Sequence, residues 1–394
     1  MTPSVHPFPA RMAPELALKS LESLASGTVL DPMTGSGTVA RVAMQRQLDA
    51  IGFDLDPLAV LISKVGTTPV KDDDVASWEG KFLDIAKGFN PDEITLPWID
   101  GDKEAERFVA YWFGEAQRSD LRRIAYALSN SDEIGLPLEI ADICKIALSR
   151  IIVTKKQAAS LAQDTSHSRP HRVAVESDYD VFDGFAKSLR AVRKRVSVIP
   201  KCGSVTINRG DARNMAGIVD ESIDAVLTSP PYLNAIDYMR GHRMSLVWLG
   251  HRYGDLTATR SASIGSERRP DRPFDEEAFK SIKDAMGSLS SLPNRHQGMI
   301  NRYVVDLLAM VGEISRVLKV KSKATFVMGN SCLKGVYIEN SEALARAGEM
   351  AGLNLTAKIE RDLPAGSRYL PTPASGALSK RMRKEVILTF AKVA

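Results

Sequence analysis

Short apolar runs alternate with amphipathic stretches in two parts of the chain, residues 1–69 and 203–394. The run 223–227 has the length and composition of a buried parallel strand. Residues 302–319 carry apolar side chains every three or four positions, which predicts a long amphipathic helix. The alternation predicts an α/β fold, a Rossmann-like doubly wound sheet that is mostly parallel. An antiparallel edge strand is expected at 385–390.

The stretch between these two parts, residues 70–202, shows helical periodicity and few strand signals. We therefore expect one α/β domain in two halves, 1–69 and 203–394, separated by a mostly helical insertion. A second, polar insertion is expected near 233–301. The later half of the helical insertion is basic, with 12 Lys or Arg against 5 Asp or Glu over 145–201. An ordinary solvated surface is the alternative explanation for these charges.

The composition is that of an ordinary globular protein, with 394 residues of which 44% are hydrophobic and 25% are charged. No window approaches the roughly 18 apolar residues of a membrane helix, and the N-terminus lacks the pattern of a secretion signal. The three cysteines are widely spaced, which favours a reducing compartment, here the cytoplasm, and disfavours a metal cluster. A net charge of +4 permits a nucleic-acid partner without requiring one.

A strand at 28–30 is followed by an acidic residue and a Gly-x-Gly turn, after which a helix begins at Thr38. Gly35 and Gly37 allow the backbone to approach a ligand closely, and the helix N-terminus points at the same place. Such turns occur in dinucleotide-binding and in methionine-cofactor proteins, but the third glycine of a pyrophosphate cradle is absent here. Asp54 ends the next strand and is suited to accept hydrogen bonds from ribose hydroxyls; a structural turn is the alternative.

The strand at 223–227 stops abruptly at Thr-Ser-Pro-Pro-Tyr, of which Ser229–Tyr232 is called the prong below. Proline cannot donate to a ladder, and it holds the residue before it in extended geometry. The prong therefore presents a hydroxyl, a carbonyl and an aromatic face at the carboxyl end of a strand, where open α/β sheets bind ligands. These groups suit a planar base whose exocyclic amine is held by Ser229 and the Pro230 carbonyl while Tyr232 stacks. A strand followed by a plain proline turn is the alternative.

Together, the Gly-rich turn and the Ser-Pro-Pro-Tyr prong resemble motifs of the S-adenosylmethionine-dependent amino methyltransferases of DNA, which act on cytosine N4 or adenine N6. The serine at the first position of the prong is more similar to the cytosine-N4 branch. The resemblance implies S-adenosyl-L-methionine as the cofactor and makes 1–69 the cofactor-binding half of a catalytic domain. It gives the catalytic role to Ser229, Pro230, Pro231 and Tyr232. The cofactor contacts that it implies come from His6, Phe8, Pro9, Asp31, Pro32, Thr34, Gly35, Ser36, Gly37, Thr38, Asp54, Asp211 and Thr228.

The resemblance also implies a double-stranded DNA substrate, and it makes the helical insertion a candidate target-recognition region. Nucleic-acid contacts are expected from polar residues after the prong and in the insertion, namely Asn234, Asp237, Arg240, Lys155, Arg169, His171 and Arg172. For each of these an ordinary structural or solvated role is the alternative. A restriction-modification system, with a cognate restriction endonuclease as a possible partner, fits the family.

Three other functions stay open from the sequence. Adenine-N6 methylation is compatible with the same prong, and RNA guanine-N2 methyltransferases carry similar prongs. A non-catalytic DNA-binding specificity subunit is the alternative from another class, although the intact prong and the Gly35/Gly37 turn count against it. Carbon-5 methylation of cytosine is disfavoured because no cysteine follows a proline or lies near the prong.

Overall fold

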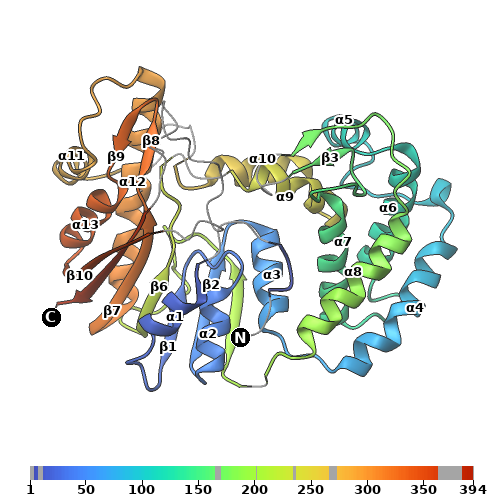
Figure 1. Ribbon diagram of the computed structural model, residues 1–394, viewed down its shortest axis with the longest axis horizontal. Helices are drawn as coiled ribbons and strands as arrows, with labels where there is room; N and C mark the ends of the chain where they lie inside the picture. The colour runs from blue at the N-terminus through green and yellow to red at the C-terminus, as the bar shows by residue number, and fades with distance from the viewer. Residues whose placement is uncertain are drawn as a thin grey trace.

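Seven strands form one central sheet in the order β10-β11-β7-β6-β1-β2-β5 (Figure 1). The computed structural model describes residues 4–7, 12–164, 170–200, 202–233, 237–265, 273–362 and 384–393. The strands of the sheet are β1 (Thr28–Asp31), β2 (Asp49–Asp54), β5 (Val205–Arg209), β6 (Ile223–Thr228), β7 (Leu318–Gly329), β10 (Leu353–Asp362) and β11 (Lys384–Lys392).

Neighbouring strands from β5 to β7 pair in parallel, whereas β11 is antiparallel to both β7 and β10. The predicted doubly wound, mostly parallel sheet is therefore confirmed. The antiparallel strand expected at 385–390 is β11. It is the second strand from the edge, because β10 is outermost. The strands β7 and β10 are not neighbours, because β11 lies between them and runs antiparallel to both.

The strand order reverses between β1 and β6. From β1 the chain continues outward to β2 and β5, and from β6 it continues outward to β7 on the other side. In open α/β sheets the ligand crevice lies at the carboxyl ends of the strands at such a reversal. The Gly-rich turn follows β1 and the prong follows β6, so the fold brings both predicted motifs to this point.

Successive residues of the central strands pack into different cores. Val29 and Leu227 lie in the cluster with α1 and α2, while Leu30 and Val226 lie in the cluster with α12 and α13. This alternation is what strands covered on both faces require. The helices that cover the sheet are α1 (Pro14–Ser20), α2 (Thr38–Gln45), α3 (Pro57–Thr67), α12 (Asn294–Val317) and α13 (Asn340–Met350).

The region 72–196 is mostly helical and lies beside the sheet, on the side of α3 (Figure 1). Its core is aromatic and aliphatic, with Phe82 and Phe185 stacked at its centre. The division of the chain into domains at 69 and 202 stays a prediction. The elements of this region are α4 (Asp72–Gly88), η1 (Pro91–Glu93), α5 (Lys103–Trp112), α6 (Glu115–Ser129), α7 (Leu138–Ile152), β3 (Ala162–Gln163), β4 (His171–Arg172) and α8 (Val181–Val196).

The chain after the prong returns to helix before it reaches α12. In Figure 1, α9 and α10 lie between the sheet and the helical region. A small hairpin follows β7. In the described parts of the chain, no helix combines the length and the apolar character needed to cross a bilayer. The remaining elements are α9 (Met239–Leu246), η2 (Val247–Leu249), α10 (Tyr253–Ala262), α11 (Glu276–Ala285), β8 (Ser331–Leu333) and β9 (Val336–Ile338).

Candidate active site

The Gly-rich turn after β1 is held from beneath by α3 and β2. Gly35 and Gly37 adopt φ values of 50° and 74°, in the left-handed region that favours glycine. A Cβ on Gly37 would lie 2.9 Å from Oγ of Ser63, so a side chain there would also collide with α3. The Ser63 hydroxyl donates to the Gly35 carbonyl at 3.0 Å, and the Gly35 amide donates to Oδ2 of Asp54 at 2.9 Å. These bonds hold the turn against α3 and β2, with Gly35 half-buried and Gly37 buried.

Asp31 and Thr228 join the turn to the strand that carries the prong. Oγ1 of Thr228 donates to Oδ1 of Asp31 at 2.7 Å, and both residues are buried. Burial raises the pKa of Asp31 to about 7, although the Thr228 hydroxyl and the Met33 amide favour its charged form. The remaining predicted residues of the turn are also buried, namely Pro32, Thr34, Ser36 and Thr38.

The prong combines one exposed hydroxyl with buried or half-buried rings. Ser229 is exposed, and its hydroxyl donates to the carbonyl of Val327 on β7 at 2.9 Å. Pro230 is buried, whereas Pro231 and Tyr232 are half-buried, and Tyr232 packs against the core cluster of α12. Because its proton is engaged by Val327, the Ser229 oxygen is left to act as an acceptor towards a ligand.

Two carboxylates follow one another at the end of β2. Asp54 accepts from the amides of Gly35 and Asp56, and burial together with the nearby Asp56 raises its pKa to about 6. Asp56 caps α3 through the amide of Leu58 at 2.9 Å, as expected of a residue before a helix that starts with proline. Its other oxygen contacts Nδ1 of His242 on α9. Burial raises the pKa of Asp56, but the charge and hydrogen bond of His242 together with the backbone amides of Leu58 and Ala59 leave the pKa below its ordinary value.

Asp211, the predicted contact to the adenine end of the cofactor, follows β5. Its two carboxylate oxygens accept from the guanidinium of Arg213 at 2.9 and 2.8 Å. Arg213 in turn donates to the fully buried Asp306 of α12 at 2.7 Å and to the Ala262 carbonyl at 2.6 Å. The cofactor role of Asp211 stays a prediction; what the structure shows is an ion-paired network that joins β5, α10 and α12.

The N-terminal segment lies against the helical region. Nε2 of His6 is 3.1 Å from Oγ of Ser149 on α7, and Arg150 donates to the Val5 carbonyl at 2.7 Å. Val5 is buried close to Gly66 of α3, so this segment lies between α3 and α7. Two predicted cofactor residues, Phe8 and Pro9, lie outside the described residues.

The β3–β4 ribbon and α9, which carry the predicted nucleic-acid contacts His171, Arg172 and Arg240, lie next to each other. Pro170, next to β4, would lie 3.9 Å from a Cβ on Gly241 of α9, so the β3–β4 ribbon is beside the helix that follows the prong. Arg172 is exposed and lies over the ring of the exposed Tyr111, 4.8 Å from its centroid. Asp237, by contrast, is ion-paired with Arg260. Three further candidates are exposed, namely His171, Arg240 and Lys155, and two, Arg169 and Asn234, lie outside the described residues.

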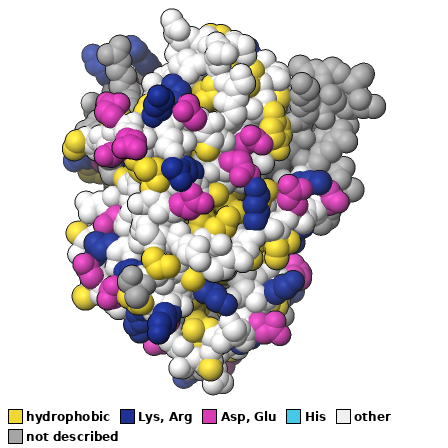
Figure 2. All heavy atoms as spheres, turned by 90° about the vertical axis from the view of Figure 1, so that its left-hand side faces the viewer, with side chains coloured by type: hydrophobic (Ala, Val, Ile, Leu, Met, Phe, Trp, Pro, Cys, Tyr) yellow, Lys and Arg dark blue, Asp and Glu magenta, His cyan; other side chains and the backbone are white. Residues whose placement is uncertain are grey.

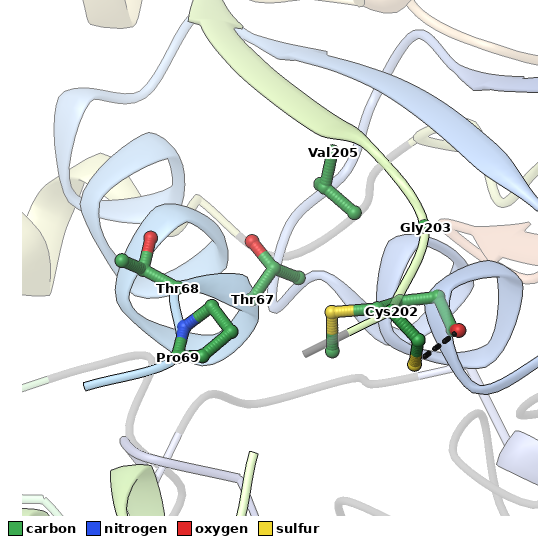
Figure 3. A pocket seen from close by; sticks show the side chains of 7 residues that line it. Thr67, Thr68, Pro69, Cys202, Gly203 and Val205 are labelled. Carbon is green, nitrogen blue, oxygen red and sulfur yellow. Dashed lines mark hydrogen bonds between the residues drawn. The ribbon is translucent and has the colours of Figure 1, made fainter. Parts of the chain in front are cut away.

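A cavity of about 540 Å³ lies at the other end of the sheet and is separate from these motifs (Figure 3). It is lined by the last residues of α3 and by Cys202 and Val205 at the start of β5. The Cys202 thiol lies 2.9 Å from the Met44 carbonyl, as the dashed line in Figure 3 shows. Since the Gly-rich turn and the prong are at the carboxyl ends of the strands, this cavity is no part of the candidate site.

Sequence reasoning missed three partners of the site, Ser63, Val327 and His242. Val327 is 98 residues from Ser229, and His242 is 186 residues from Asp56. No local spacing connects such pairs, because the parallel strand order and the packing of α9 bring them together. The sequence signal for Ser63 was not specific, because Lys64 and Thr67 are also polar residues of the helix 57–67.

Comparison with known proteins gives a relative over nearly the whole chain. Type II methyltransferase M.MvaI of Kocuria varians is 22% identical over 415 residues, covering 98% of this chain and 90% of that protein. The chain is similar to type II methyltransferases. M.BsoBI of Geobacillus stearothermophilus, also a type II methyltransferase, is 23% identical over 256 residues, 60% of this chain and 50% of its own. The methyltransferase resemblance predicted from the two motifs is thereby confirmed, and S-adenosyl-L-methionine as the cofactor agrees with it.

No protein-family model matches the chain. Among solved structures, an S-adenosylmethionine-dependent methyltransferase from Methanosarcina mazei aligns over 95% of this chain and 97% of its own, with 7% identity and a TM-score of 0.35. A TM-score this low supports no conclusion about fold. The fold assignment rests on the strand order and on the positions of the two motifs.

Proposed function

We propose that the chain is a DNA methyltransferase that moves the methyl group of S-adenosyl-L-methionine to the exocyclic amine of a flipped base, with cytosine N4 as the acceptor. The observation that carries the proposal is the hydrogen bond between Thr228 and Asp31, because it brings the prong against the Gly-rich turn. A donor held by the turn and an amine held by the prong would then be neighbours. Similarity to type II methyltransferases supports this reaction class. The choice of cytosine rests on the serine at the first position of the prong.

The residues of the turn fit S-adenosylmethionine. Gly35 is half-buried and has no side chain, so a ligand can approach its backbone closely, and Asp54 offers its carboxylate at the end of the next strand. Each Asp54 oxygen accepts one backbone amide and keeps capacity for a second donor, so two ribose hydroxyls can bind without displacing a contact. When bound, the cofactor supplies a methyl group activated by a positively charged sulfur.

The prong supplies orientation. An aromatic amine is a poor nucleophile because its lone pair is delocalised into the ring. Ser229, whose own proton goes to Val327, would accept one amine N–H, and the carbonyl of Pro230 would accept the other. The two acceptors draw the nitrogen towards tetrahedral geometry and aim its lone pair at the methyl group. As the N–C bond replaces the C–S bond, S-adenosylhomocysteine would leave, and the methylated nitrogen would release its extra proton to solvent. This is catalysis by positioning and electrostatics, with no covalent intermediate on the protein.

Tyr232 supports the extruded base. Removing a base from the duplex costs a few kcal/mol, and stacking on an aromatic ring returns about 1–3 kcal/mol. One side of Tyr232 packs against the core while the residue stays half-exposed, which suits a ring that is fixed in place and still open to a ligand.

The exposed basic residues of the β3–β4 ribbon and of α9 are the proposed phosphate contacts. The face formed by α11, α13 and β10 is not proposed as a DNA surface, because basic and acidic side chains intermingle there (Figure 2). Several charges on that face are paired, for example Arg346 with Glu349 and Lys384 with Glu360. A mixed surface neutralises its own field, whereas an unbalanced basic surface attracts the DNA backbone.

The test is transfer of labelled methyl groups from S-adenosylmethionine to unmethylated genomic DNA, followed by digestion and chromatography of the nucleosides. A labelled N4-methylcytosine is the expected product, and Ser229→Ala is the matched variant in which the label should fall about 100-fold. N6-methyladenine would correct the base while keeping the mechanism. Label in RNA but not in DNA would contradict the DNA substrate, and no label in either would contradict the enzymatic function.

A further inference from the structure

His242 is a buried histidine that methyl transfer as described above does not use. It lies on α9, the helix that follows the prong, and is 6% exposed. Its Nδ1 contacts Oδ2 of Asp56, which is 8% exposed, and the ring of Tyr238 stacks on the imidazole with centroids 6.1 Å apart. Burying a titratable pair costs desolvation free energy, and this pair joins residues that are 186 positions apart in the chain. We therefore expect the pair to have a function.

Asp56 passes the contact on to the cofactor side. Its Oδ1 holds the first turn of α3 through Leu58, and its backbone amide donates to Oδ1 of Asp54 at 2.9 Å. Oδ2 of Asp54 then accepts the amide of Gly35. A continuous series of hydrogen bonds thus runs from α9 through two carboxylates to the Gly-rich turn.

We propose that His242 is a positioning residue that couples cofactor binding to DNA binding, because its bond to Asp56 ties the helix after the prong to the turn that holds the cofactor. The proposal rests on the proposed function. Cofactor binding fixes Asp54 and the turn, and through Asp56 it fixes α9 and the segment that leads back to the prong. Linkage makes the effect reciprocal: DNA on the prong side then strengthens cofactor binding by the same factor.

The contacts of the pair explain why the coupling is carried here. A buried carboxylate that loses its partner is destabilised, so Asp56 has one favourable arrangement, with α9 docked. Other polar ties of α9 point elsewhere. The hydroxyl of Ser245 donates to the Ser149 carbonyl of α7 at 3.4 Å, and Arg243 donates to the Tyr253 hydroxyl of α10 at 3.2 Å. Among the ties that the structure describes on α9, the His242–Asp56 bond is the one directed at the cofactor turn.

The experiment measures binding of S-adenosyl-L-homocysteine by calorimetry, with and without unmethylated genomic DNA. In the unaltered protein DNA is expected to lower the dissociation constant by about 5-fold or more, the usual size of such coupling. His242→Leu, which keeps the volume but removes the bond, should reduce that factor to about 1. His242→Asn should restore it, because the Asn amide occupies the position of Nδ1 and can donate to Asp56.

Ser245→Ala is the control, since it loosens α9 against α7 and should leave the coupling factor unchanged. A factor that persists in His242→Leu, or a factor of 1 in the unaltered protein, would overturn the proposal. If His242→Leu fails to fold, Asp56→Ser replaces it: Ser can still cap α3 with its one hydroxyl but has no second oxygen for His242, and an unchanged factor there would also overturn the proposal. Failure of the unaltered protein to bind S-adenosylhomocysteine at all would instead refute the proposed function.

Discussion

Two regions of this molecule bury different kinds of side chain. The carboxyl end of the sheet buries polar groups close together, among them Asp31, Asp56, Thr228 and His242. The helical region 72–196 instead has a mostly apolar core, built on pairs such as Phe82 and Phe185. Buried polar groups cost free energy unless they are satisfied, whereas apolar packing contributes stability directly. The comparison predicts that changes in the helical core act on stability, whereas changes at the carboxyl end of the sheet act on chemistry.

The largest effect should come from the core of the helical region. Phe185→Ala removes a fully buried ring that stacks on Phe82 at 5.5 Å, and it should lower the free energy of unfolding by about 3–5 kcal/mol. Urea denaturation measures this change. At a temperature where the variant stays folded, methyl transfer per folded molecule should be unchanged. A drop in activity without a drop in stability would contradict the proposed division between the two regions.

The polar end should instead make stability depend on pH. The folded-state pKa of Asp31 is raised to about 7, so the folded state holds its proton over a range in which the unfolded chain has lost it. Stability from this group is greatest below about pH 4 and falls as the pH rises to about 7, by at most about 4 kcal/mol at 1.4 kcal/mol for each pKa unit. Asp31→Asn should flatten this decline in denaturation curves measured between pH 4.5 and 8. The raised pKa of Asp54 acts in the same direction and should leave a smaller slope in the variant.

Tyr232→Ala separates target binding from cofactor binding. Loss of the stacking ring should reduce methyl transfer by about 100-fold, near the upper end of the 1–3 kcal/mol that stacking contributes. Binding of S-adenosylhomocysteine should be spared, and Tyr232→Phe should retain most of the activity. Equal loss of cofactor binding and of methyl transfer in Tyr232→Ala would contradict the role assigned to the ring.

Local sequence patterns were sufficient to predict the sheet and the positions of the two motifs. Apolar runs ending in Gly-x-Gly or in Ser-Pro-Pro-Tyr fix a strand, its end and a turn within a few residues, so the positions of Gly37 and Ser229 could be predicted. The position of β11 between β7 and β10 could not be predicted, because it depends on the order in which distant strands pair. The pairing of His242 with Asp56 and the engagement of Asp211 by Arg213 are also tertiary outcomes, and nothing in the spacing of these residues shows whether a carboxylate faces a ligand or a neighbouring arginine.

The smallest predicted effect concerns the surface of the helical region. Arg172 is exposed and lies over Tyr111, which holds the guanidinium in place without neutralising it. If it contacts one DNA phosphate, Arg172→Ala should weaken binding about equally for all DNA sequences and lower the slope of log K against log salt by about 1. Arg346→Ala is the matched control, because Arg346 lies on α13 and is paired with Glu349. DNA binding of both variants is titrated at several salt concentrations. Equal slopes in the two variants would mean that the helical region contributes packing alone. A lower slope confined to Arg172→Ala would extend the functional part of the molecule from the sheet onto that region.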